Sequence, residues 1–289
     1  MATIFGISAV LLWGMLALLG TLTTGIPPFQ LLSICFFISA LLMFGKRLCR
    51  REPVFALPRL TRSQWLFGII GLFGFHFCYF LALRQAPAID VSLMVYIWPL
   101  LLALFVANRQ TAGRAMIGGC LGFIGIALII LGDGSLALDQ AHWTGYLLAL
   151  CCALIWSGYS WYLSRSDNSV EDIGWLSAAV AILSLLAHLG LENGHWELSG
   201  TEWLGALLLG LGPVGGAFYL WDLGLKRGNK SLLASLSFSA PLISSVLLAL
   251  AGLHSWSMNI VIALGLILTG ALVNNWPKRI RRLSRPENA

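Results

Sequence analysis

Ten apolar runs limit the fold of this chain more than any other feature, because each reaches the roughly 20 residues that a helix needs to cross the hydrocarbon of a bilayer. Charged residues make up only 10% of the 289-residue chain, against about 25% in a typical soluble domain. The sequence therefore predicts an all-α polytopic membrane protein with ten transmembrane helices. The predicted spans are about 3–22, 28–46, 64–84, 88–108, 114–132, 142–164, 172–191, 202–225, 231–251 and 256–276.

The basic residues are divided unevenly between the two ends of these spans. Of the 18 Lys and Arg residues, Arg84 alone falls on one side. Because short loops rich in Lys and Arg stay in the cytoplasm, we expect both termini in the cytoplasm and the chain in a bacterial inner membrane. This orientation explains the net charge of +6 without a nucleic acid partner. The cytoplasmic basic residues are Lys46, Arg47, Arg50, Arg51, Arg59, Arg62, Arg109, Arg114, Arg165, Lys226, Arg227, Lys230, Lys278, Arg279, Arg281, Arg282 and Arg285, and the acidic residues opposite are Asp133, Asp139, Glu192, Glu197 and Glu202.

The second half of the chain repeats the pattern of glycines and prolines of the first half, at an offset of 142 residues. Arg84 matches Lys226 at this offset, although the two lie on opposite sides of the membrane. Five spans is an odd number, so the two halves must be inverted, as in many secondary transporters with a midplane binding site. We expect repeats at 1–137 and 138–289 around a central cavity. The hinge or kink candidates are Gly68, Gly71, Gly74 and Pro99, with Gly210, Pro213, Gly216 and Pro241 as their counterparts.

His76 is the histidine placed deepest in an apolar span. A titratable group inside a span marks a functional site by default, and the alternative is a neutral imidazole bound to a backbone carbonyl. Pro99 in the next span frees a carbonyl, which is tolerated where the backbone lines a cavity. Aromatic side chains surround both positions in the sequence. The candidate cavity residues are His76, Tyr79, Tyr96, Trp98, Trp13, Trp156, Ser157 and Trp161.

A cavity lined in this way would be aromatic and nearly uncharged. It suits a zwitterion with a large apolar side chain, because stacked rings contribute roughly 0.5–1.5 kcal/mol each and an ammonium binds over an aromatic face. The chain carries no HExxH, GxSxG or P-loop motif, and its six cysteines lack metal-ligand spacing. We therefore expect neither an enzyme nor a metal or cofactor site.

The ten spans, the paired halves, the Trp-Gly of the first span and the passage ALRQAPAIDVSLMVYIWPLL resemble the EamA-type exporters of the drug/metabolite transporter superfamily. Within it, Tyr96-Ile-Trp98-Pro99 and His76-x-x-Tyr79 are similar to the YddG-type aromatic amino acid exporters. The resemblance implies a ten-helix fold, a central cavity, and export of aromatic and other neutral amino acids by alternating access. The counterpart of Trp98 is Ala240, so we expect the cavity to be asymmetric.

We interpret the chain as an inner-membrane exporter of aromatic and other bulky neutral amino acids. Facilitated diffusion is favoured over proton coupling, because few carboxylates lie within the spans. The alternative is an exporter of hydrophobic drugs or cationic metabolites in the same fold, which could be proton-coupled. A scaffold or channel is disfavoured by the short loops and the lack of a filter-like repeat. The expected partners are the amino acid and the lipid bilayer, with a monomer favoured over an oligomer.

Overall fold

The computed structural model describes residues 1–132, 138–194, 196–253 and 255–276. Some of the predictions fall outside this part of the chain. They concern Asp133, the repeat boundary at residue 137, and the basic tail of Lys278, Arg279, Arg281, Arg282 and Arg285.

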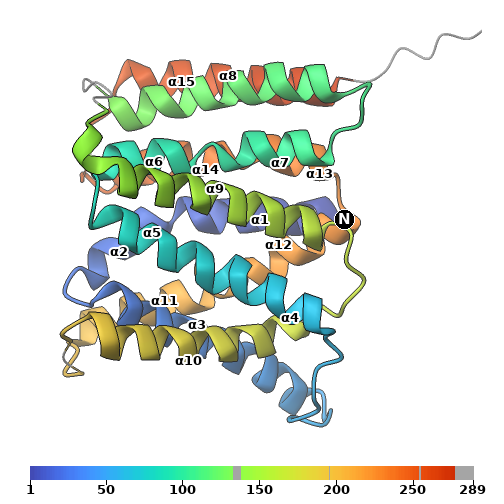
Figure 1. Ribbon diagram of the computed structural model, residues 1–289, viewed down its shortest axis with the longest axis vertical. Helices are drawn as coiled ribbons and strands as arrows, with labels where there is room; N and C mark the ends of the chain where they lie inside the picture. Colours follow the sequence, from blue (N-terminus) through green and yellow to red (C-terminus); the bar gives the residue numbers. More distant parts are fainter. Residues whose placement is uncertain (133–137, 195, 254, 277–289) are drawn as a thin grey trace, which may run out of the picture.

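All regular elements in the described ranges are helical, and they form one bundle in which the long axes run side by side (Figure 1). The ends of the spans therefore lie at two opposite faces of the bundle. The elements are α1 (Ala2–Gly14), α2 (Leu16–Gly20), η1 (Thr21–Thr23), α3 (Pro28–Cys49), α4 (Arg62–Ile69), η2 (Ile70–Gly74), α5 (Phe75–Leu83), α6 (Ala88–Val95), α7 (Trp98–Val106), α8 (Ala112–Leu131), η3 (Gln140–His142), α9 (Trp143–Leu163), α10 (Asp172–Leu191), α11 (Gly200–Leu211), α12 (Gly216–Arg227), α13 (Lys230–Leu236), α14 (Ser239–Leu250) and α15 (Met258–Asn275).

Eight helices in the described residues are long and apolar enough to cross a membrane, and the number rises to ten if each of two bent pairs is one span. The pairs are α1 with α2 and η1, bent by 41°, and α13 with α14, bent by 40°. They correspond to the predicted first and ninth spans. The count of ten spans therefore stays a prediction.

Four predicted spans are interrupted where the sequence weakens the helix. Span 64–84 passes through the π-helical turn η2, and span 202–225 breaks at residues 212–215 between α11 and α12. Pro99 and Pro241 each lie in the first turn after a break, in α7 and α14. A first-turn proline loses no intrahelical hydrogen bond, because the N–H at that position has no partner in the helix. Both prolines therefore begin a new helical segment.

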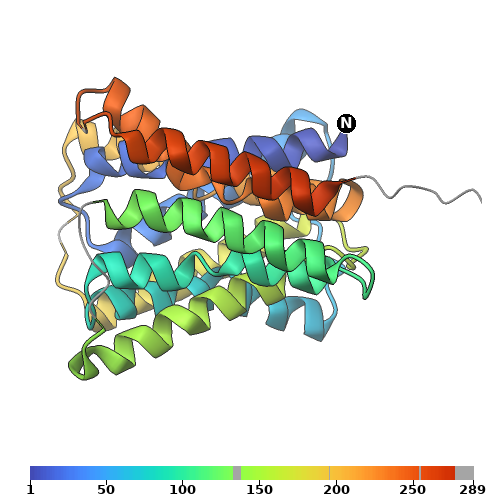
Figure 2. The same ribbon diagram turned by 90° about the horizontal axis from the view of Figure 1, so that it is seen from above.

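Two antiparallel helix pairs form opposite sides of the bundle, α8 with α15 and α3 with α10 (Figures 1 and 2). In α8 and α15 the backbones touch, since a Cβ added to Gly118 would lie 2.5 Å from the carbonyl oxygen of Gly270. Small residues permit the close helix contact that drives association in lipid. In α3 and α10 the contact is polar instead: Ser33 Oγ donates to Ala181 O at 3.0 Å, and Ser39 Oγ lies 3.0 Å from Ser177 Oγ.

Replacing Gly118 with leucine is expected to prevent assembly of the α8–α15 pair. The added atoms would meet backbone, which cannot move aside as a flexible side chain does. Gly113→Leu in the same helix is the matched control, because a Cβ there meets nothing within 4 Å. Size-exclusion chromatography of the solubilised proteins measures the effect. A monodisperse Gly118→Leu protein at the control's yield would contradict this packing.

The ends of α3 and α10 are joined by an ionic contact. Lys46 and Arg47 at the end of α3 both bind the Glu171 carboxylate, which precedes α10. The hydrogen bond from Lys46, with the contact to Arg47, lowers the pKa of Glu171 below its ordinary value. A lowered pKa in the folded state stabilises the fold above the ordinary carboxyl pKa, and this contribution is lost as the pH falls through the folded-state pKa.

The stability difference between the wild type and Glu171→Gln should therefore depend on pH. We expect the wild type to have the higher melting temperature at pH 7, and the two values to converge as the pH falls below about 4. Thermal unfolding in detergent across this range measures the difference. A gap of constant size at every pH would show that the charge of Glu171 does not stabilise the pair.

Candidate functional site

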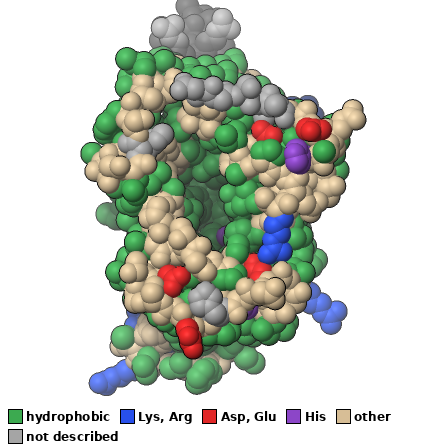
Figure 3. Space-filling view, turned by 90° about the vertical axis from the view of Figure 1, so that its left-hand side faces the viewer, with side chains coloured by type: hydrophobic (Ala, Val, Ile, Leu, Met, Phe, Trp, Pro, Cys, Tyr) green, Lys and Arg blue, Asp and Glu red, His purple; other side chains and the backbone are tan. Residues whose placement is uncertain are grey.

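A cavity of about 330 Å³ lies at the centre of the bundle. Figure 3 looks onto the left-hand face of Figure 1 and shows a hollow between hydrophobic side chains. The fold brings together cavity residues from α1, α5, the α6–α7 junction and α9, which are distant in the sequence. The described lining residues include no Lys, Arg, Asp or Glu. Six of the eight candidate residues line the cavity, namely Trp13, His76, Tyr79, Tyr96, Trp98 and Trp156.

Ser157 and Trp161 are not brought to this cavity. Ser157 is fully buried, and its hydroxyl donates to Ala153 O at 2.7 Å within α9. The ring of Trp161 lies under the Arg165 guanidinium, 4.5 Å from its centroid. Both residues contribute to the packing and polar contacts of α9.

Phe218 and Ala240 line the cavity although they were not among the candidates. A signal for them was present in the sequence, because they match His76 and Trp98 at the offset that relates the two halves. Trp221, which matches Tyr79 at the same offset, is fully buried next to the cavity. Residues that match at the repeat offset, one from each half of the chain, therefore lie around the same cavity.

Trp13, Trp98, Trp156 and Trp221 form a cluster in which Trp13 and Trp98 each contact the other three rings, here called the tryptophan cluster. The ring of Trp13 is central, with its centroid 5.0 Å from Trp221, 5.7 Å from Trp156 and 6.3 Å from Trp98. Most of these contacts are edge-to-face, the geometry that aromatic quadrupoles favour. Trp221 and Trp156 are buried, and the rings of Trp13, Trp98 and Trp156 line the cavity, so the cluster forms an aromatic wall of the cavity.

The break between α11 and α12 fixes the orientation of Trp13. Its indole Nε1 donates to the carbonyl oxygen of Pro213 at 3.1 Å. Pro213 lies within the break, where its carbonyl lacks the partner that a continuous helix would give. Non-helical backbone at membrane depth is tolerated beside a cavity. Here the indole N–H of Trp13 provides the hydrogen bond for one of its carbonyl groups. The proline predicted as a kink residue therefore also positions a cavity side chain.

His76 makes the backbone contact of the alternative interpretation and also lines the cavity, and its role in substrate binding stays a prediction. Its Nδ1 lies 2.6 Å from the carbonyl oxygen of Leu72, one turn back across η2, and its ring lines the cavity among Phe36 and Phe218. A carbonyl oxygen can only accept, so Nδ1 carries the proton. In the neutral imidazole the other nitrogen, Nε2, is then an acceptor.

The glycines predicted as hinges differ in their surroundings. An added Cβ on Gly71 would lie 2.3 Å from the Tyr159 ring, and on Gly68 it would lie 2.6 Å from Leu176. Gly74 is roomier, with nothing closer than 3.7 Å, whereas a Cβ on Gly210 would lie 2.9 Å from Ile38. Close packing accounts for three of these four glycines, and any role in motion stays a prediction.

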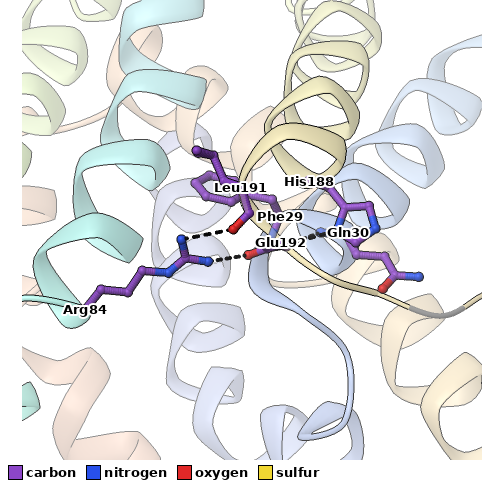
Figure 4. Close-up of polar contacts among 6 residues, drawn as sticks. All are labelled: Phe29, Gln30, Arg84, His188, Leu191 and Glu192. Atoms are coloured by element: carbon purple, nitrogen blue, oxygen red, sulfur yellow. Dashed lines mark hydrogen bonds and ion pairs between the residues drawn. The ribbon is translucent and has the colours of Figure 1, made fainter.

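A buried carboxylate joins three helices at the face with the hollow (Figure 4). Glu192 follows α10, and its oxygens accept hydrogen bonds from the backbone of Phe29 at 3.1 Å and from Arg84 Nη2 at 3.1 Å. His188 Nδ1 lies 3.0 Å from the same carboxylate. Because Phe29 lies in the first turn of α3 and Arg84 directly follows α5, Glu192 holds three spans together. The sequence indicated only that Glu192 and Arg84 share one face.

No group of three or more His, Cys, Asp or Glu side chains within the described ranges could hold a metal ion.

The EamA-like transporter family matches residues 1–131 and 143–276. An aromatic amino acid exporter, YddG, of Ancylobacter novellus is 40% identical over 279 residues, covering 94% of this chain and 96% of the relative. The protein of that name from Escherichia coli is 25% identical and covers 86% and 87% of the two chains. A solved structure titled only as the crystal structure of a protein is 38% identical, with a TM-score of 0.88 over 95% of this chain and 96% of the other. The chain belongs to the EamA-like transporter family and is a multi-pass membrane protein.

Proposed function

We propose that this protein exports aromatic and other bulky neutral amino acids across the bacterial inner membrane. The observation that carries the proposal is the central cavity, whose described walls are aromatic and apolar and carry no full charge. A volume of about 330 Å³ is at the small end of ligand pockets, which run from about 300 to 1,000 Å³. Relatives at 40% and 25% identity are named aromatic amino acid exporters, in agreement with this chemistry.

The proposed cycle is alternating access between two inverted repeats, residues 1–137 and 138–289, with ten spans and both termini in the cytoplasm. In this orientation the hollow faces outward, on the side of Arg84 and Glu192. The tryptophan cluster then closes the inner end of the cavity. Support comes from the lone basic residue on the outer face and from the matched positions around one space.

Counterflow in proteoliposomes tests the proposal. Vesicles loaded with unlabelled phenylalanine should accumulate labelled phenylalanine saturably, with competition by tryptophan, tyrosine and leucine. We expect the rate to be unaffected by a pH gradient, as facilitated diffusion requires. Competition by tetraphenylphosphonium instead of amino acids would favour the alternative, export of hydrophobic drugs or cationic metabolites. Absence of saturable counterflow for every aromatic amino acid would refute the proposed function.

His76 is proposed to accept a hydrogen bond from the substrate ammonium through Nε2. A hydrogen bond to a charged group contributes about 1.5–3 kcal/mol, so His76→Leu should lower kcat/KM for phenylalanine by roughly 10- to 100-fold. His76→Gln, which keeps an acceptor, should retain more activity. N-acetylphenylalanine, which lacks the ammonium, should compete poorly with the wild type. Equal kcat/KM in wild type and His76→Leu would exclude this role.

A further inference from the structure

An ion pair lies beneath the tryptophan cluster, on the side away from the hollow. Asp222 follows Trp221 in α12 and is fully buried. One turn later, Lys226 Nζ donates to Asp222 Oδ2 at 2.8 Å, and the Lys226 side chain is only 9% exposed. Neither residue lines the cavity, so substrate contact does not explain why the two charges are buried.

The pair ties α12 to the end of α9 and to the chain that follows it. Lys226 Nζ also donates to the carbonyl oxygen of Asn168, between α9 and α10, at 2.8 Å. One position before Asp222, the Trp221 indole donates to Ser160 Oγ of α9 at 3.1 Å. Asp172, at the start of α10, is close enough to Lys226 to interact with its charge. These contacts fix the Trp221 ring, which packs against the cavity residue Trp13 at a centroid distance of 5.0 Å.

The energetics of this arrangement depend on hydration. A buried carboxylate is costly unless it is paired and hydrogen-bonded, and Asp222 Oδ1 has no hydrogen-bond partner among the described residues. Lys226 offsets the cost only while it stays in place. Opening this end of the bundle would expose both charges to water and remove the cost of burying them. Without Lys226 the closed state would hold an unpaired buried carboxylate, so loss of the contact favours opening.

We propose that Asp222 and Lys226 are positioning residues of the transport cycle, which hold Trp221 in the closed position, and that Lys226 leaves the Asn168 carbonyl when the inner end opens. This inference rests on the proposed transport function, because it concerns the route by which substrate enters the cavity. It assigns the pair a role in conformational change and none in substrate binding.

The test measures how accessible a cysteine introduced at the end of α9 is to a thiol reagent, and it needs no substrate. Leu163, at the end of α9, is 4% exposed and takes part in none of these hydrogen bonds. In Leu163→Cys protein in lipid nanodiscs, N-ethylmaleimide labelling is measured by peptide-resolved mass spectrometry. Lys226→Met leaves Asp222 buried without its cation and should raise the labelling rate at least about tenfold. Asp222→Asn should raise it at least about threefold.

The double variant distinguishes the loss of an ion pair from a general loss of packing around position 163. In Asp222→Asn/Lys226→Met no charge is buried, so labelling should be lower than in Lys226→Met alone. Lys226→Arg should behave as the wild type, and Arg227→Met, which removes an exposed neighbouring charge, should have no effect. Cys152, which is fully buried in α9, reports unfolding and should stay unlabelled throughout.

Three results would overturn the proposal: unchanged labelling in Asp222→Asn, a double variant labelled as fast as Lys226→Met, or labelling of Cys152 in step with position 163. Should Lys226→Met fail to accumulate in membranes, Asp222→Asn decides alone. Because accessibility is read without substrate, failure of the proposed amino acid transport would leave this result interpretable.

Discussion

Trp13→Ala is expected to lower aromatic amino acid counterflow at least about a hundredfold, while the protein still reaches the membrane. The Trp13 ring contacts four other aromatic rings around the cavity, including Trp221 at 5.0 Å and Phe218 at 6.4 Å. An aromatic contact contributes about 0.5–1.5 kcal/mol, and each factor of ten in rate corresponds to about 1.4 kcal/mol of activation free energy. Trp13→Ala removes a ring that lines the cavity together with its contacts to Trp98 and Trp156, so a loss of about 3 kcal/mol in the transport step is expected.

A second substitution separates the ring of Trp13 from its hydrogen bond. Trp13→Phe keeps an aromatic surface but leaves the Pro213 carbonyl without its indole donor. A neutral hydrogen bond contributes about 0.5–1.5 kcal/mol, so we expect a loss of no more than roughly tenfold. Trp143→Ala, at an exposed position at the start of α9, is the matched control. Wild-type counterflow in Trp13→Ala would remove the tryptophan cluster from the mechanism.

The six candidates that line the cavity are aromatic or imidazole side chains within apolar spans, and these two features of the sequence were enough to select them. Phe218 could have been added as well, because it matches His76 at the offset and lines the same cavity. Ser157 shows where the reasoning failed. Successive residues on a helix point about 100° apart, and in α9 this rotation turns Ser157 away from the cavity that Trp156 lines. The Ser157 hydroxyl bonds within its own helix instead.

The tertiary hydrogen bonds were beyond what the sequence could predict. Glu192 and Phe29 are separated by 163 positions, and nothing in either segment indicates that one caps the other. The same holds for Lys226 and the Asn168 carbonyl. The pattern of apolar residues in a span does not determine how the helix is rotated, or how deep it lies, relative to its neighbour. Rotation and depth decide which polar groups come into contact. Residues 212–215 are an intermediate case. Gly-Pro is a recognisable breaker, and Pro213 was predicted as a kink candidate, but nothing in the sequence indicated that its carbonyl would accept a hydrogen bond from Trp13.

The backbone path between α11 and α12 leaves no room for a side chain at position 215. A Cβ added to Gly215 would lie 1.8 Å from the Gly210 carbonyl oxygen, and one added to Gly216 would lie 2.1 Å from that of Leu211. Both contacts are with backbone of the same chain segment, so no rotamer relieves them. A larger residue must therefore change the path of the chain between α11 and α12, and with it the Pro213 carbonyl that Trp13 binds.

Gly215→Val is accordingly expected to abolish counterflow, as Trp13→Ala does, but through the backbone. Gly265→Val in α15 is the matched control, because a Cβ there meets nothing within 4 Å, and it should transport at the wild-type rate. Intrinsic fluorescence distinguishes the routes. A displaced break should alter the environment of Trp13, so Gly215→Val should change the emission more in a protein that has Trp13 than in Trp13→Phe. A Gly215→Val protein with normal flux would mean that side chains and not this break position Trp13, and the function proposed for Pro213 would then fall with it.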